Sequence, residues 1–412
     1  MRIISFRHAT LSAVEDIVTP RRGEVGVVYL TGLAQGLSLI TFPAVSTILT
    51  NPKLYHLSDS EYGALFVPLV VLAIAGSSLG PGIARRSGLK WVFVAGMGFN
   101  LGAMVVLASS QWFVASHGAA YALLLVATAA LGAGFGTTLM ALNTYVEEFF
   151  PTRSDVAIPA LHAFLGTGSA LAPVLIAVSA GAAWWALPVA VASGFMLLGL
   201  AALGQPLRGG EEDPVPRAAA IEMPRERPVG LWPYAAAVLL YGVCETAFGN
   251  WATIYLHEDR RLSLASAEFA LTAFWAFVTA GRVAVAAIAI WIPVRWIYRA
   301  LPLLILAAFL AIPAASHRAA AGIAAFGIAG VGCSAFFPLS ISLAEQRFST
   351  RAATVSGELV TVYMIGYGLA AFGIGPIRDV GHVPLGVVYP GASVLAAATA
   401  VLAWRVTAAM PR

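Results

Sequence analysis

The chain has 412 residues, of which 59% are of hydrophobic types and only 11% are charged, with a mean hydropathy of +0.83 and a formal net charge of +4. A soluble domain is typically about 25% charged, so this chain has too few polar side chains to cover a water-soluble globule, and a soluble enzyme is excluded. Because a membrane-spanning helix needs about 20 apolar residues, the chain has room for about twelve of them.

The predicted spans follow in chain order from stretches with few or no charged residues. In the first half they cover 25–52, 62–84, two helices within 91–146 that separate near 109–118, and two helices within 156–207 that separate near Gly181. In the second half they cover 231–256, 264–291, 300–316, 319–344, 352–377 and 384–404. The alternating pattern of a membrane β-barrel is absent, so helices are the remaining way to satisfy the backbone in a bilayer. We predict an all-α membrane protein with twelve transmembrane helices.

Residues 205–230 differ in composition from the spans on either side. They hold five prolines and nine charged residues, which is typical of a solvated linker. We therefore divide the chain into an N-terminal segment (1–24), a bundle of six helices (25–204), this linker (205–230) and a second bundle of six helices (231–406).

Lysine and arginine are concentrated on one side of the predicted spans. Of the 24 such residues, 18 lie in the termini, the linker and the loops of the same side, five lie in the loops of the other side, and Arg282 lies within a span. Since cytoplasmic loops carry the excess of positive charge, both termini and the linker are expected in the cytoplasm. The first 24 residues lack the pattern of a cleaved signal peptide. The chain is expected to be a multi-pass protein of the inner or plasma membrane.

The two halves repeat each other weakly. Glu147, Phe150, Thr152 and Arg153 after the fourth span recur as Glu345, Phe348, Thr350 and Arg351 after the tenth, and Gly132 and Gly134 recur as Gly330 and Gly332, all at an offset of 198. At a slightly different offset, Gly32 and Gln35 in the first span correspond to Gly242 and Glu245 in the seventh. Two parallel halves are typical of secondary transporters.

These features together resemble the major facilitator superfamily over essentially the whole chain. The signature of that family between its second and third helices, G-x-L-A-D-R-x-G-R-K, is matched here by residues 81–90, Pro-Gly-Ile-Ala-Arg-Arg-Ser-Gly-Leu-Lys. Four positions of the signature are kept, whereas Arg85 stands at the acidic position. The resemblance implies two pseudo-symmetric six-helix bundles that transport a solute by alternating access.

The seventh and eighth spans are similar to the fucose and glucose permease-like branch of the superfamily. The similar residues are Tyr241-Gly242-x-x-Glu245, Asn250-Trp251, Phe274-Trp275 and Gly281-Arg282. This similarity implies a small polar, sugar-like solute and coupling to protons. An exporter of amphipathic compounds or lysolipids, favoured by a wide aromatic cavity, remains the alternative, and a membrane sensor that does not transport is a remote one.

Charged side chains within spans are candidates for function, because each costs about 2.5–3.5 kcal/mol on membrane-insertion scales. Glu245 lies about 21 Å from the cytoplasmic end of the seventh span, and Arg282 lies about 13 Å from that end of the eighth. A long arginine side chain largely spans this difference in depth. We interpret the two residues as a pair that responds to protons or substrate, or as a buried ion pair that fixes helix packing.

Further polar and aromatic side chains in the spans are candidates for ligand contacts. They are Gln35, Asn143, Asn250, Trp251 and Trp275 for the substrate, and His162 for a proton. An amide offers donors and an acceptor to sugar hydroxyls, but it also holds helices together. Indole rings stack on sugars or anchor helices at the bilayer surface. A histidine exchanges a proton near neutral pH or hydrogen-bonds a neighbouring helix.

Charged residues near the cytoplasmic helix ends form a predicted inner gate. They are Arg85, Arg86, Glu147, Arg153, Glu345, Arg351 and Glu358. In the superfamily the acid of the signature loop interacts with the start of the eleventh helix, where free amides favour an anion. Because Arg85 replaces that acid, we predict a reversed latch in which Arg85 or Arg86 binds Glu358, about 9 Å into the eleventh helix, when the cavity faces outward.

The sequence contains no pattern for catalysis. Catalytic clusters, metal-ligand runs and phosphate-binding loops are absent, and the two cysteines, Cys244 and Cys333, lie in apolar runs and form no disulfide framework. We expect no cofactor, no metal and no nucleic-acid partner. The expected partners are a small-molecule substrate, a proton as coupling ion and the lipid bilayer around a monomer.

Overall fold

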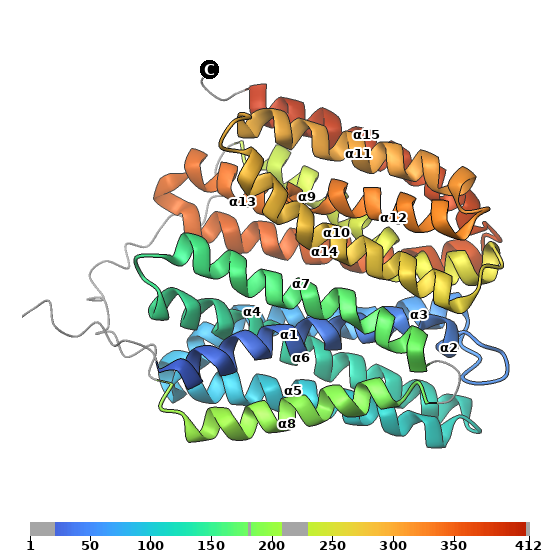
Figure 1. The fold of residues 1–412 in the computed structure, drawn as a ribbon, viewed down its shortest axis with the longest axis horizontal. Coiled ribbons are helices and arrows are strands. Elements are labelled where there is room, and N and C mark those ends of the chain that lie inside the picture. Colours follow the sequence, from blue (N-terminus) through green and yellow to red (C-terminus); the bar gives the residue numbers. More distant parts are fainter. Residues whose placement is uncertain (1–20, 180–182, 208–229, 409–412) are drawn as a thin grey trace, which may run out of the picture.

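The computed structural model describes residues 21–179, 183–207 and 230–408, and within these ranges every regular element is a helix (Figure 1). The first half holds α1 (Arg22–Ala44), α2 (Ser46–Leu49), α3 (Asp59–Ala64), α4 (Phe66–Ser87), α5 (Leu89–Ser109), α6 (His117–Phe149), α7 (Ser154–Ser179) and α8 (Ala186–Gly204). The second half holds α9 (Trp232–Ile254), α10 (Leu264–Ile288), α11 (Val294–Ala315), α12 (Ala319–Cys333), α13 (Phe336–Arg347), α14 (Ala352–Asp379) and α15 (Leu385–Ala408). Nearly all of the predicted segment 1–24 and linker 205–230 lies outside the described residues.

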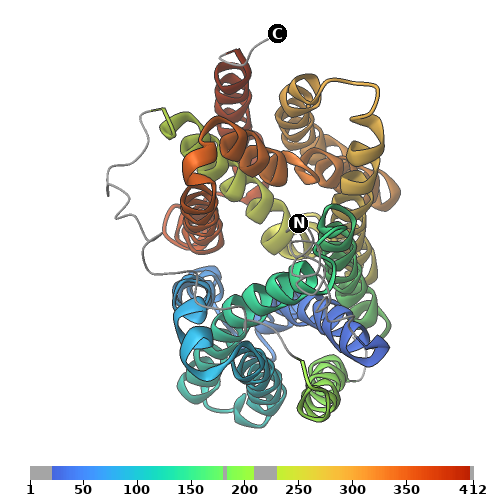
Figure 2. The same ribbon diagram turned by 90° about the vertical axis from the view of Figure 1, so that its left-hand side faces the viewer.

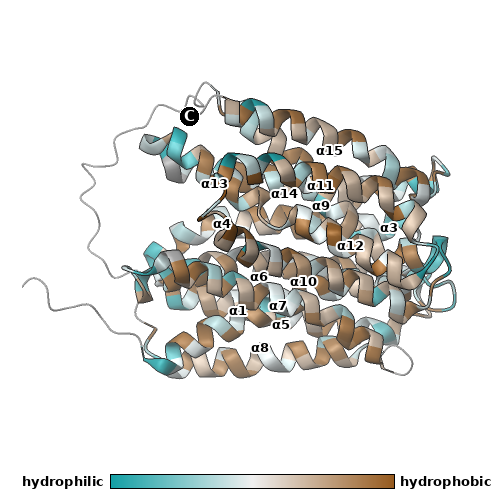
Figure 3. Cartoon of the chain, turned by 45° about the horizontal axis from the view of Figure 1, so that its top comes forward, coloured by the Kyte–Doolittle hydropathy of each residue, from teal (hydrophilic) through white to brown (hydrophobic). Residues whose placement is uncertain are grey.

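The all-α prediction is confirmed, and the helices correspond to the twelve predicted spans. In the described ranges eleven spans are long and apolar enough to cross a membrane. The twelfth, α9, is more polar, but it packs against α14 and α15, so that it is shielded from lipid. Apolar residues cover the middle of the assembly and polar residues gather at its two ends (Figure 3).

Several spans differ in detail from the prediction. The first two are interrupted, at Val45 between α1 and α2 and at Leu65 between α3 and α4. The ninth span, α11, begins at Val294 rather than at residue 300, because the helix continues past Arg295 and Arg299, whose long side chains can reach the membrane surface. The predicted span 319–344 is interrupted between α12 and α13. Pro338 explains the interruption, since it has no amide proton to donate to the carbonyl of Ser334 four residues earlier, and its ring clashes with that carbonyl in a continuous helix.

The two halves occupy separate parts of the structure, with α1–α8 below and α9–α15 above in Figure 1, and Figure 2 shows them from one end. The repeated glycines serve the same purpose in each half. A Cβ on Gly132 of α6 would lie 2.2 Å from the carbonyl oxygen of Leu69 on α4, and a Cβ on Gly330 of α12 would lie 2.2 Å from that of Phe274 on α10. The duplicated sequence therefore builds duplicated helix crossings, which only glycine permits at this separation.

The halves contact each other unequally along their length. We call the end where Arg22, Gly204, Trp232 and Ala408 lie the linker end, and the other the far end. Near the far end α14 covers α3 and α4, with Gly63 against Ala371 and Gly368 against Val70. Towards the linker end α14 no longer covers α4, and the side chains of Leu79 and Ile83 are 63% and 50% exposed. Midway, α7 packs against α10, where Gly166 meets Thr279.

Candidate functional site

Glu245 lies at the centre of a buried polar network in the second half. Its side chain, on α9, is 4% exposed. Oε2 accepts a hydrogen bond from the Tyr363 hydroxyl on α14 at 2.5 Å, and Oε1 lies 2.9 Å from the Tyr241 hydroxyl one turn earlier on α9. The rings of these tyrosines pack among aromatic neighbours, with Phe337 stacked on Tyr363 at 4.6 Å. The carboxyl is therefore held in a fixed position by two hydroxyl groups.

The break between α12 and α13 supplies two backbone acceptors to the same network. The Tyr241 hydroxyl lies 2.6 Å from the carbonyl oxygen of Cys333, and Nε of Arg282 donates to the carbonyl oxygen of Ser334 at 2.9 Å. The Ser334 carbonyl is the one that Pro338 cannot serve. The interruption of the helix thus positions Arg282 by giving it a backbone partner.

The expected direct ion pair between Glu245 and Arg282 is not formed, and this part of the prediction is wrong. Arg282 is close enough to act electrostatically on Glu245, but it binds Ser334 while the carboxyl binds Tyr241 and Tyr363. The reason is the free carbonyl at the helix break, which competes for the guanidinium. The two charged groups are connected through neighbouring carbonyls and one tyrosine.

The other candidates on α9 lie closer to its far end. Asn250 donates to the Tyr367 hydroxyl on α14 at 3.1 Å. Trp251 is fully buried, and its ring meets that of Tyr62 on α3 edge to face at 5.3 Å. Tyr62 also donates to the backbone carbonyl of Asn250 at 3.0 Å. These residues therefore join the two halves, so that Trp251 is not a bilayer anchor.

One face of α10 carries a polar stripe. Its members are Glu268, Thr272, Trp275, Thr279 and Arg282, spaced by three or four residues so that they share one side of the helix. The stripe faces the boundary between the halves, because Thr279 meets Gly166 of α7. Trp275 lies over Gly249 of α9, 3.0 Å from where a Cβ would be. Its indole Nε1 is buried and has no hydrogen-bond partner.

Gln35 links helices in the first half, which is the second of the two interpretations given above for an amide in a span. Its Nε2 donates to Oδ1 of Asn100 on α5 at 3.2 Å and to Ser38 at 3.3 Å, and its Oε1 accepts from Asn100 at 2.8 Å. Asn100 also donates to Thr138 on α6 at 3.2 Å. Gln35 has no exposed surface, and its donors are fully used. It is therefore not available to a substrate in this conformation.

Asn143 on α6 and His162 on α7 are both partly buried. The Asn143 amide donates to the carbonyl of Leu139 on its own helix at 2.9 Å. His162, on α7, is partly exposed and lies within electrostatic range of Arg282 on α10. The histidine is thus close to the boundary between the halves, whereas the asparagine has turned back to its own backbone.

An ion cluster joins the halves at the far end. Arg378 at the end of α14 binds Asp59 of α3 at 2.8 Å and lies 3.3 Å from Asp259 and 3.8 Å from Glu258 in the turn after α9 (Tyr255–Asp259). Glu258 also accepts from Thr50 at 2.6 Å. We call these residues, Asp59, Glu258, Asp259 and Arg378, the far-end cluster. With the glycine contacts beside it, the cluster holds the far end closed.

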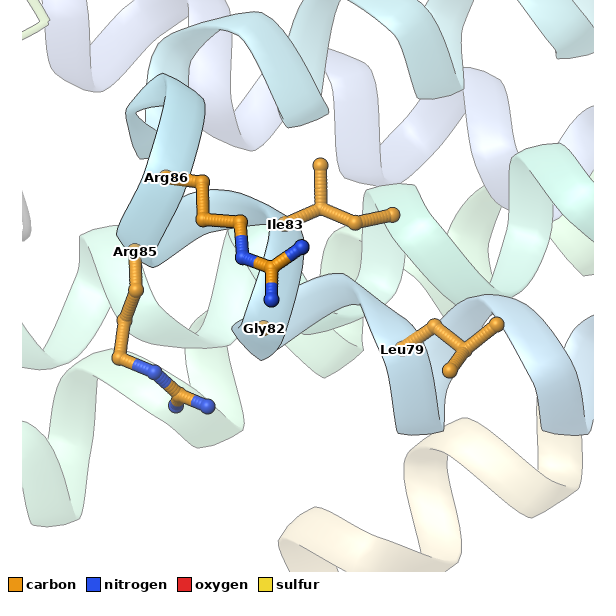
Figure 4. A pocket seen from close by; sticks show the side chains of 5 residues that line it. All are labelled: Leu79, Gly82, Ile83, Arg85 and Arg86. Atoms are coloured by element: carbon orange, nitrogen blue, oxygen red, sulfur yellow. The ribbon is translucent and has the colours of Figure 1, made fainter.

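The residues of the predicted inner gate lie at the linker end. Arg85, Arg86, Glu147 and Arg153 are exposed, Glu345 accepts a hydrogen bond from Ser356 of α14, and Arg351 and Glu358 are partly buried. A cavity of about 390 Å³ runs along α4 at this end, with Arg86 beside Ile83 and Arg85 extending in another direction (Figure 4). Neither arginine forms an ion pair with an acidic residue that the structure describes. The latch, predicted for the opposite conformation, stays a prediction.

Several residues of the site were not predicted. They are Asn100, Tyr363, Tyr367, Glu268 and the far-end cluster. Glu268 was visible in the sequence as a second charge in its span, together with Arg282. The tyrosines carry no such signal, because an aromatic residue in a span is ordinary. No group of three or more metal-ligating side chains occurs in the described ranges.

Comparison with known proteins gives one family and several structures. The family model described as the Major Facilitator Superfamily matches residues 27–371. A variant of the nucleoside transporter NupG is 12% identical, with a TM-score of 0.70 over 93% of this chain and 98% of that chain. A D-xylose-proton symporter is 14% identical (TM-score 0.71; 93% and 97%), and a variant of the E. coli fucose:proton symporter FucP is 15% identical (TM-score 0.59; 95% and 99%). At such low identities the TM-scores show a shared fold alone. No curated protein sequence matches the chain.

Proposed function

This chain belongs to the Major Facilitator Superfamily, and we propose that it couples the movement of a small, hydroxyl-rich solute to that of a proton. Family membership makes it a multi-pass membrane transporter rather than an enzyme. The solute class and the proton are the proposal, and Glu245 is its proposed proton-binding residue.

A shortage of protons around Glu245 carries the proposal. The Tyr241 hydroxyl has one proton and two acceptors in reach, Oε1 of Glu245 and the carbonyl of Cys333. With Glu245 ionised, one of these contacts between oxygens lacks a proton. A proton on Oε1 would let Glu245 donate to Tyr241 while Tyr241 donates to Cys333, so that every member is satisfied. The network therefore has a place for one transferable proton.

The groups near this carboxyl support a hydroxylated solute. Asn250 and Tyr367 offer donors and acceptors, and Trp275 offers an aromatic face with an unpartnered N–H. This combination of a flat apolar ring and a few polar groups suits a sugar ring. The structural neighbours include transporters of fucose, xylose and nucleosides, which are all hydroxylated.

The unequal contacts between the halves support alternating access. The far end is closed by its cluster, whereas α4 is uncovered at the linker end. We propose that this is one of two alternating conformations, and that the other closes the linker end through Arg85 or Arg86 and Glu358 while the far-end cluster separates.

A two-step experiment tests the function. Thermal unfolding of the purified protein is first measured with panels of sugars, polyols, nucleosides and amphipathic drugs. The solute that stabilises it is then offered to proteoliposomes with and without an inward proton gradient. We expect a sugar-like solute to be accumulated only with the gradient. Stabilisation by amphipathic drugs alone, or uptake that ignores the gradient, would refute the proposal.

A further inference from the structure

Glu268 is a buried carboxyl that the proposed mechanism does not use. It lies in the second turn of α10, has no exposed surface, and neither of its oxygens has a hydrogen-bond partner. The free amide groups in the first turn of α10, which could have bound an anion, do not reach it. An isolated ionised carboxylate in such surroundings is too costly to persist, and the group takes up a proton instead.

The surroundings of Glu268 contain further unpartnered polar atoms. Thr272 Oγ1 follows on the same face of α10, and the buried Nε1 of Trp251 on α9 also lacks a partner. The buried Ser46 side chain on α2 lies near the Tyr62 side chain. Tyr62 links this region together, since its ring meets Trp251 and it lies within electrostatic range of Glu268. Neither oxygen of Glu268 is paired with a cation among the described residues, since the largely buried Arg378 of the far-end cluster binds Asp59 instead.

Glu268 lies directly behind the closed far end. Tyr62 belongs to α3, whose Asp59 binds Arg378 in the far-end cluster, and the adjacent Gly63 is pressed against α14. When α3 and α14 separate, water would enter beside Tyr62 and reach Glu268. The same separation would not uncover Glu245, which is enclosed by Tyr241 and Tyr363 nearer the middle of α9 and α14.

We propose that Glu268 is a second proton-binding site, protonated while the far end is closed and exchanging its proton with water on that side when the far end opens. The proposal rests on the proposed proton coupling. In water a glutamate is ionised at neutral pH, so that opening releases the proton from the carboxyl oxygen to solvent. Opening then becomes more favourable as pH rises, by up to about tenfold per pH unit.

The other titratable groups in this region either affect opening of the far end in the opposite direction or lie away from Glu268. α10 packs chiefly against α7, α9, α12 and the turn after α9. On these elements lie His162, Tyr241, Glu245, Tyr255, His257, Glu258 and Asp259, α3 adds Asp59 and Tyr62 nearby, and the cations of the region are Arg260, Arg261, Arg282 and Arg378. The far-end carboxylates hold the gate through Arg378 when ionised. Their protonation at low pH would loosen the gate, whereas protonation of Glu268 keeps it closed. The sign of the pH effect therefore separates the two.

A cysteine behind the gate reports the opening. Ser46 is fully buried here, and Ser46→Cys is introduced into a protein that also carries Cys244→Ala and Cys333→Ala. The protein is placed in nanodiscs and labelled with a water-soluble maleimide, with no transported solute present. The labelling rate is measured in this protein with Glu268 intact and with Glu268→Gln. Dividing the first rate by the second at each pH removes the pH dependence of the thiol itself. We expect the ratio to rise several-fold per unit between roughly pH 6 and pH 8.

Glu61→Gln is the matched control, because Glu61 binds the exposed His117 and the Ser58 amide at the start of α3 without belonging to the far-end cluster, and a glutamine oxygen can still accept from Ser58. The Glu61→Gln variant should show the same pH dependence of the labelling rate as the Ser46→Cys protein without it. A ratio that is constant or falls with pH overturns the proposal. Since no solute is present, an error in the proposed substrate class leaves this result unaffected.

Infrared spectroscopy provides a second measurement that does not depend on gating. At neutral pH the parent should show the carbonyl band of a protonated carboxylic acid that is missing in Glu268→Gln but present in Glu245→Gln. If the spectrum of Glu268→Gln retains every such band, Glu268 is ionised and the proposal is wrong.

Discussion

The hydroxyl of Tyr363 on α14 donates to Oε2 of Glu245 on α9, beside a close approach of these two helices. Gly242 makes that approach possible, since a Cβ there would lie 2.7 Å from the carbonyl oxygen of Tyr363. The same tyrosine thus contributes its backbone to a helix crossing and its side chain to the buried carboxyl. Any movement of α14 against α9 would change the surroundings of Glu245.

Tyr363→Phe tests this bond. The substitution keeps the ring that stacks on Phe337 but leaves one carboxylate oxygen without its donor, which should cost about 1–3 kcal/mol of stability and slow proton-driven uptake. Tyr234→Phe is the control, because the buried Tyr234 hydroxyl has no partner and its loss should not destabilise the protein. Thermal unfolding in detergent compares the two, and equal effects would contradict the assigned role of Tyr363.

Glu245→Gln should abolish concentrative uptake and leave solute exchange measurable. The amide can accept from Tyr363 and donate to Tyr241, as a protonated glutamate would, so that the protein should remain folded while it can no longer release a proton. Uptake with a proton gradient and counterflow without one are measured in the same proteoliposomes. Accumulation equal to that of the parent would remove Glu245 from the coupling.

Arg282→Ala should destabilise the protein by leaving the Ser334 carbonyl without its donor, at about 1–3 kcal/mol. Because Arg282 and Glu245 share a network without touching, the additional change Glu245→Gln should restore only a small part of this, with a coupling near the lower end of the range of about 0.5–3 kcal/mol for residues of one network. A double-mutant cycle in thermal unfolding measures it. Recovery of most of the loss in the double variant would instead indicate a direct ion pair.

Gly330→Ala should prevent the close crossing of α12 and α10. The added methyl group would meet the carbonyl oxygen of Phe274, a backbone atom that cannot turn aside, and overpacking of this kind costs about 1–3 kcal/mol. Gly194→Ala on α8 is the matched control, since nothing lies within 4 Å of its Cβ. The melting temperature of the control should be unchanged or raised, and that of Gly330→Ala lowered.

Arg85→Glu should impair transport if the linker end closes through the reversed latch. Arg85→Glu together with Glu358→Arg should then recover part of the uptake rate. The gain is expected to be modest, because an exposed ion pair contributes about 1 kcal/mol or less. The same exchange at Arg86 identifies which arginine is the partner, and failure of both exchanges would leave the latch without support.

The sequence was sufficient to locate the spans because each is a stretch with few or no charged residues, which holds even for the more polar α9. The paired crossings at Gly132 and Gly330 were predictable from the glycine repeat, since close approach of helices demands the absence of a side chain. The break before α13 was predictable from Pro338, whose effect on the preceding carbonyl is local. Its consequence was not, because the partner of Ser334 is Arg282, 52 residues away in sequence.

The candidate site was only partly predictable for a related reason. Glu245 and Arg282 stood out as charges in apolar surroundings, and both lie in the network. Gln35 was equally conspicuous, yet Asn100 on α5 engages it within its own bundle. A polar residue in a span shows that a partner exists, but the identity of that partner depends on the helix rotation, which apolar length does not determine.

The uninterrupted α6 and the broken pair α12 and α13 give the duplicated chain two unlike sides. At the repeat offset of 198, Ser334 and Pro338 correspond to Gly136 and Met140, and the first half keeps a continuous helix from His117 to Phe149 there. A solute that binds the carboxyl network would stay with the second half while the first half moves relative to it. The contacts between the solute and the second half would then change little between entry and exit. Release would depend on water and protons reaching that single bundle.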